Sequence, residues 1–111
     1  MVRMPGGDQA VVDESKLRGY LLNPDHALGT HHAHLFRTLL GIDVDSTEVL
    51  AQALRTAARD GETTLGKASV FGQKYEIRFP MSGPRGSYTV LSVWIIPTGV
   101  EIPYLVTAYI E

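Results

Sequence analysis

Hydrophobic side chains recur at helical spacing in the first part of the chain, up to about residue 61. Leucines and alanines fall there at intervals of three and four residues, which is the period of one face of an α-helix. This pattern predicts three helices. They run from Asp13 to about Asn23, from Thr30 to Leu40, and from Asp45 to Gly61.

Capping residues mark the ends of these helices. Asp13 and Thr30 are typical N-caps, and Gly41 is placed to cap the end of the second helix. Asp45 and Glu48 have the spacing of a capping box at the start of the third helix. Each helix therefore has a start or stop signal of its own.

After residue 61, apolar residues alternate with polar ones, as in half-buried strands. In the best example, Lys74, Glu76 and Arg78 point away from the apolar side of their strand. The predicted strands run from Gln9 to Val12 as a short edge strand, Thr63 to Val70, Gln73 to Met81, Ser87 to Ile96 and Tyr104 to Ile110, with a hairpin loop from Ser82 to Gly86. The strand from Ser87 is apolar on both faces, which predicts a central position. In the last strand we expect Leu105, Thr107 and Tyr109 to share one face.

The order of helices and then strands predicts an α+β fold, with N-terminal helices packed on one face of a four-stranded antiparallel meander sheet. A length of 111 residues fits one domain. It would be mainly helical over residues 1–61 and a sheet over residues 62–111. The uncovered face of such a sheet is where we expect a ligand.

Composition removes several function classes. There are 10 Lys and Arg against 12 Asp and Glu, so the formal charge of −2 gives no global basic field for nucleic acid. With no cysteine, the chain has no disulfide, thiolate zinc site or cysteine nucleophile. We find no apolar run long enough to span a membrane and no leader. We therefore expect a cytoplasmic protein without a membrane partner.

Three histidines, His31, His32 and His34, lie within four positions, with His26 just upstream. One interpretation is a solvated helix start. A second is catalysis, because a histidine can take or give a proton at neutral pH, as RNA cleavage by 2′-OH attack requires. A third is a metal site formed by His31 and His34 with His26 or Asp25, although the spacing is not that of the zinc-protease helix.

Lys74 and Arg78 share one face of their predicted strand. They are either solvated cations screened by Glu76 or a clamp for phosphate, which an arginine can bind with two donors. Thr107 and Tyr109 would join them if the last strand presents its hydroxyls on the same face.

The middle strand and its neighbour supply candidate substrate-binding residues. We assign this role to Tyr75, Ser92 and Trp94, because Trp94 is able to stack on a base. A single tryptophan beside Ile96 also fits a position in the core. No nucleophile elbow, phosphate-binding glycine loop or dinucleotide fingerprint occurs.

Several segments resemble a bacterial domain family of unknown function. The matching segments are Leu17 to Phe36, Phe71 to Tyr75, Ser82 to Gly86, Val93 to Ile96 and Leu105 to Tyr109. Members of that family occur as small stand-alone proteins and at the C-termini of phage head-morphogenesis and polymorphic-toxin proteins. The order of helices and meander, with a closing Thr-x-Tyr strand, is similar to the barnase–EndoU–colicin–RelE group of metal-independent ribonucleases.

The resemblance implies a ribonuclease-like toxin domain that needs no cofactor. RNA and a cognate immunity or antitoxin protein would be its partners, and Lys74, Tyr75, Thr107 and Tyr109 match the family pattern. Family members often carry Lys-Ala where this chain has His32-Ala33, so His32 either replaces a catalytic lysine or marks a lost activity. The alternative is a non-enzymatic interaction domain, as half of a two-gene module or as a homodimer.

Overall fold

The structure, a computed structural model, describes residues 2–22 and 30–111, and only the backbone of residues 20, 21 and 30–32 among them. The helical elements are η1 (Gly7–Gln9), α1 (Glu14–Lys16), η2 (Leu17–Leu21), α2 (Thr30–Leu40), η3 (Val44–Ser46) and α3 (Thr47–Asp60). The strands are β1 (Thr63–Ser69), β2 (Gly72–Gly83), β3 (Gly86–Pro97) and β4 (Tyr104–Ile110).

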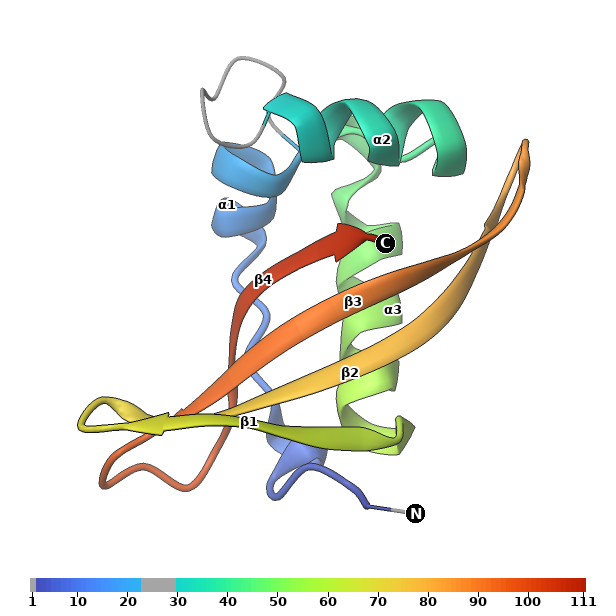
Figure 1. The fold of residues 1–111 in the computed structure, drawn as a ribbon. Helices are drawn as coiled ribbons and strands as arrows, with labels where there is room; N and C mark the ends of the chain where they lie inside the picture. Colours follow the sequence, from blue (N-terminus) through green and yellow to red (C-terminus); the bar gives the residue numbers. More distant parts are fainter. Residues whose placement is uncertain (1, 23–29) are drawn as a thin grey trace.

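The four strands form one antiparallel meander in the order β1-β2-β3-β4. Figure 1 shows α3 running along one face of this sheet, with α2 near the end where the β2–β3 hairpin turns. The α+β prediction is therefore confirmed, including the internal position of β3. The other face of the sheet carries no helix in this view.

The core lies between α3 and the sheet. Leu50 and Leu54 of α3 are fully buried, as are Ile77 of β2 and Val90 and Trp94 of β3. The register places Ile77 beside Ser92 and Phe79 beside Val90, so one set of alternating residues on these strands faces the helices. The alternate set, which includes Lys74 and Arg78, faces away from the helices.

The helix ends match the sequence in part. The second helix ends as predicted, because Gly41 has φ +70° and the Ile42 N–H donates to the Phe36 carbonyl at 3.0 Å, as in a Schellman motif. The predicted capping box of Asp45 and Glu48 is wrong. Asp43 and Ser46 form the box instead, since the Asp43 N–H donates to Ser46 Oγ at 2.9 Å and a 3₁₀ turn precedes α3.

The predicted edge strand from Gln9 to Val12 is also wrong. A 3₁₀ turn, η1, occupies its first residue, and only Val11 forms a bridge, parallel to Tyr104. Gly6 has φ +67° and turns the chain into η1, and Asp13 already caps α1, so only Ala10, Val11 and Val12 lie between the two helical elements.

The β2–β3 hairpin is longer than predicted, because β2 continues to Gly83 and the loop is only Pro84-Arg85. A Cβ at Gly83 would clash with the Leu39 carbonyl oxygen and lie 2.5 Å from Leu40 Cα. A glycine is therefore needed here for the hairpin to contact the end of α2.

The last strand contains a bulge that the sequence pattern did not reveal. Val93 pairs with Thr107, but Trp94 pairs with Leu105, so Val106 is an extra residue on β4. The bulge turns Leu105 toward the core, where it is 6% exposed. The prediction that Leu105 shares a face with Thr107 and Tyr109 is corrected accordingly.

Candidate functional site

The register of the three central strands brings the predicted cations and hydroxyls onto one sheet face. Arg78 lies beside Leu91, which in turn lies beside Tyr109. One step along the sheet, Glu76 lies beside Val93, which lies beside Thr107. Lys74, Arg78, Thr107 and Tyr109 therefore occupy the face that α3 leaves uncovered; we call this group the open-face site.

Arg78 crosses this face toward the end of β4. Its Nε donates to Glu111 Oε1 at 2.8 Å, and its Nη1 lies 3.6 Å from Glu76 Oε1. The hydrogen bond to Glu111, together with the nearby negative charges, raises the pKa of Arg78. The guanidinium is therefore a permanent cation that two carboxylates already accompany.

The side chain of Arg78 also explains an unexpected burial. Leu91 is only 4% exposed although it points to the uncovered face. Its neighbours across the sheet are Arg78 and Tyr109, and Arg78 reaches past it to Glu111. The aliphatic part of an arginine covers apolar surface well, so Leu91 forms an apolar floor beneath the ion pair.

Lys74 occupies the other end of the open-face site. It is exposed, and within residues 2–22 and 30–111 it takes part in no ion pair. Arg78 follows Lys74 four positions later on β2, so their two Cα atoms are about 13 Å apart. Of the two cations of the open-face site, Lys74 is therefore the one that can bind an anion without first losing a carboxylate partner.

The three predicted substrate-binding residues lie on the opposite face. Ser92 and Trp94 are fully buried, and Tyr75 is half-buried against the core. Ser92 Oγ donates to the Ile77 carbonyl at 2.8 Å and accepts from Trp94 Nε1 at 2.9 Å. The expectation that Ser92 and Trp94 join Lys74 and Arg78 is not met, because strand alternation turns them toward the helices.

The histidines lie on or before α2. His34 is exposed on that helix, and no hydrogen bond or ion pair of the described chain links it to the open-face site. His31 and His32 are placed by their backbone alone, while His26 and Asp25 lie outside the described residues. The described part of the chain contains no group of three His, Cys, Asp or Glu able to hold a metal ion.

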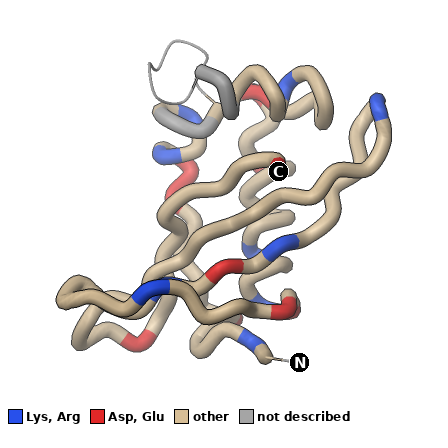
Figure 2. Tube along the Cα trace, in the orientation of Figure 1, with Lys and Arg blue, Asp and Glu red and all other residues tan. Residues whose placement is uncertain are grey.

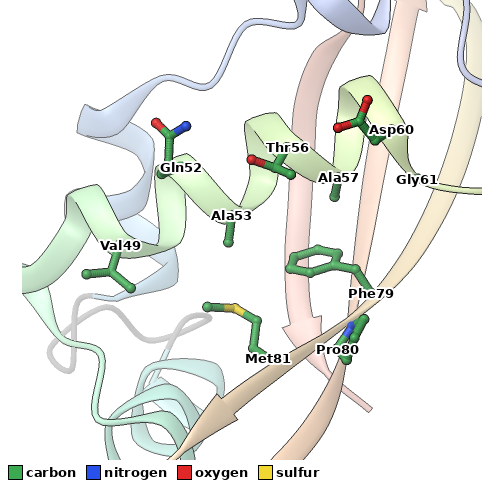
Figure 3. A pocket seen from close by; sticks show the side chains of 10 residues that line it. All are labelled: Val49, Gln52, Ala53, Thr56, Ala57, Asp60, Gly61, Phe79, Pro80 and Met81. Carbon is green, nitrogen blue, oxygen red and sulfur yellow. The ribbon is translucent and has the colours of Figure 1, made fainter.

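An apolar groove between α3 and β2 was not anticipated from the sequence. It has a volume of about 640 Å³. Figure 3 shows Val49, Ala53, Phe79 and Met81 directed into it from the two elements. The other lining residues are Gln52, Thr56, Ala57, Asp60, Gly61 and Pro80. The sequence gives no clear signal for this groove, because Val49 fits the apolar stripe of its helix; in the structure Val49 is 55% exposed.

Charges of both signs are interspersed along the trace in Figure 2, with no large area of one sign in that view. A polyanion would therefore be held by particular residues rather than by the overall field. None of the described helices is both long and apolar enough to cross a membrane.

Comparison with known proteins gives one family and one fold. A family model described as "Domain of unknown function (DUF6883)" matches residues 3–111. No curated protein matches the chain. The fold is similar to one chain of a solved contact-dependent growth inhibition toxin–immunity protein complex from Klebsiella pneumoniae 342, with a TM-score of 0.69, 18% identity, and coverage of 91% of this chain and 99% of that one.

Proposed function

Because the chain belongs to the DUF6883 family, whose description assigns no activity, we propose its function from the open-face site: a metal-independent ribonuclease-like toxin domain. The observation that carries this proposal is the register that brings Lys74, Arg78, Thr107 and Tyr109 together on the uncovered sheet face. The similar fold of a chain from a toxin–immunity complex supports a toxin setting and a neutralising protein partner.

The chemistry that fits these residues is transfer of an RNA phosphodiester to its own 2′-oxygen. A base removes the 2′-OH proton, the 2′-oxygen bonds to phosphorus, and the bond from phosphorus to the 5′-oxygen breaks. An acid then protonates the leaving 5′-oxygen, which leaves a 2′,3′-cyclic phosphate. We assign the role of general base or general acid to His31, His32 or His34.

Lys74 and Arg78 would stabilise the negative charge that develops on the phosphorane, and Thr107 and Tyr109 would position phosphate or ribose. Arg78 must first exchange a carboxylate of Glu111 for a phosphate oxygen. Because the pair is half-exposed, its net stabilisation is small and such an exchange is inexpensive. Lys74 needs no exchange.

The proposal is tested by inducible expression in a bacterial host, with growth and total RNA followed together. We expect growth arrest and RNA fragments from the wild type, relieved by Lys74→Ala and by Thr107→Val. Arg55→Ala is the matched control, since Arg55 lies on α3 and pairs with Glu48 at 3.7 Å. Purified protein should cleave RNA in the presence of a chelator. Intact RNA and normal growth with soluble wild-type protein would refute the enzyme.

One observation favours a second candidate, a non-enzymatic partner domain. Arg78 is accompanied by both Glu76 and Glu111, an arrangement that neutralises the cation instead of presenting it. The solved complex with the similar fold contains an immunity protein as well as a toxin. If expression is harmless, protection of a host against a co-expressed toxin is the readout for this second role.

A further inference from the structure

The turn between β1 and β2 displays two large apolar side chains to solvent. Val70 is 83% exposed and Phe71 is 76% exposed. They form a two-residue loop between the paired residues Ser69 and Gly72. Neither residue has a positive φ, and Gly72 directly after them takes φ +146°, so this turn does not call for Asn or Gly at positions 70 and 71. Its backbone geometry does not require an aromatic ring either.

The loop is nevertheless held firmly by the neighbouring β3–β4 connection. Thr98 donates from its N–H to the Phe71 carbonyl at 3.1 Å and from its Oγ1 to the Val70 carbonyl at 2.9 Å. The Phe71 N–H donates to Ser69 Oγ at 3.1 Å. The carbonyls of Val70 and Phe71 and the N–H of Phe71 are thus all hydrogen-bonded. The ring of Phe71 is presented on a fixed backbone, which lowers the entropy lost when a ligand binds.

The ends of β1 and β2 next to this turn carry cations. The segment from Thr63 to Tyr75 contains Lys67 and Lys74 and no acidic residue. Both lysines are exposed, and neither takes part in an ion pair within the described part of the chain. A β-bulge places Gly66 and Lys67 of β1 opposite Lys74 of β2. The two lysines are therefore neighbours across the two strands.

Phe71 is also continuous with the open-face site. It directly precedes β2, the strand that carries Lys74 and then Arg78. Figure 1 shows this turn at the far end of the sheet from the β2–β3 hairpin. The seven residue steps from Phe71 to Arg78 span about 23 Å, enough for several nucleotides of an extended chain. An exposed aromatic ring followed by spaced cations is the arrangement that binds single-stranded nucleic acid.

We infer that Phe71 is a stacking subsite for a base of single-stranded RNA, whose backbone then runs along β2 past Lys67 and Lys74 toward Arg78. This inference rests on the proposed function for the substrate and extends it to a position remote from the scissile bond. Stacking needs a ring, and any base presents one, so the subsite selects unpaired strands rather than a sequence.

The test uses a fluorescently labelled 2′-O-methyl oligonucleotide of mixed sequence, because the blocked 2′-oxygen cannot attack and binding is measured without cleavage. Fluorescence anisotropy should show binding of the single strand and weaker binding of a duplex of the same composition. Phe71→Ala should weaken binding at least about fivefold, since stacking contributes about 1–3 kcal/mol per base. Phe71→Trp should restore it.

Val70→Ala is the matched control, because Val70 is apolar, adjacent and similarly exposed but has no ring. The inference is overturned if the wild type binds no single strand, if Phe71→Leu binds as well as the wild type, or if Val70→Ala is as harmful as Phe71→Ala. That last result would mean that the turn acts through apolar contact in general and not through stacking on the ring of Phe71. Cleavage of unmodified RNA is measured separately, so a protein that binds through Phe71 without cleaving refutes only the enzyme.

Discussion

The hydroxyl of Ser92 is the hydrogen-bond partner of the Trp94 indole N–H, two residues away on the same strand and the same buried face. The same hydroxyl donates to the Ile77 carbonyl of the neighbouring strand. One small side chain therefore satisfies the polar atom of the largest side chain in the core. This relationship assigns both residues to stability rather than to a ligand.

Ser92→Ala should reduce the free energy of unfolding by about 1–3 kcal/mol, because it leaves a buried indole N–H without an acceptor. Urea unfolding followed by circular dichroism measures the loss, because the comparison variant replaces Trp94, the one tryptophan of the sequence. Trp94→Phe is the useful comparison, since it removes the N–H and leaves the bond from Ser92 to Ile77. In the double variant the two losses should not add. Equal stability of Ser92→Ala and wild type would contradict the role given to this hydroxyl.

Glu111→Gln should strengthen binding of single-stranded oligonucleotide by about two- to fivefold, because Arg78 loses an exposed carboxylate partner at 2.8 Å. Anisotropy titrations at low and high salt provide the measurement. Glu76→Gln, which changes a longer contact of 3.6 Å, should have a smaller effect. Unchanged affinity in both variants would mean that Arg78 does not meet the nucleic acid.

Gly83→Ala should destabilise the protein by about 1–3 kcal/mol, as expected for overpacking a close contact. The new methyl group would clash with the Leu39 carbonyl and push the β2–β3 hairpin away from α2. Thermal unfolding by circular dichroism measures the change. Gly19→Ala is the control, since a Cβ there has no atom within 4 Å; a similar loss in both variants would argue against the clash.

Glu14→Gln should stabilise the protein at neutral pH and have little effect in acid. The hydrogen bond between Glu14 and Glu48 raises the pKa of Glu48 above its usual value of 4.5, so the pair is most favourable when it shares a proton. The stabilisation from this hydrogen bond is fully present below the ordinary pKa of Glu48 and is lost as the pH rises through its raised pKa. The amide of the introduced glutamine can still donate a hydrogen bond to Glu48 but carries no charge. Unfolding curves across this pH range, with Glu62→Gln as the exposed control, check the sign.

The alternation of Lys74, Glu76 and Arg78 was predictable because side chains of a strand point to its two faces in turn. It correctly separated these residues from the apolar side of β2. What alternation within one strand leaves open is how neighbouring strands align. The sequence is therefore compatible with Ser92 and Trp94 beside the cations, whereas the observed register turns them to the helix face.

Of two local features that the prediction misses, one is visible in the sequence and the other is not. Asp43 and Ser46 have capping-box spacing, but Asp45 and Glu48 two residues later have it too. The bulge at Val106 leaves little trace, since the residues around it are apolar on either face. The roles of the histidines remain predictions, because they depend on side chains and residues that lie outside the description of α2.

The single extra residue in β4 has a consequence for how this protein tolerates changes of length. Leu105 already pairs with Trp94 and Thr107 with Val93, so deleting Val106 would leave a regular ladder in which these residues keep their faces. Inserting a residue into β4 has no such remedy, because a second extra residue would turn Leu105 out of the core or bury the hydroxyls of Thr107 and Tyr109. In relatives of this chain, β4 should therefore tolerate the loss of one residue at the bulge, whereas insertions should be confined to the β3–β4 connection.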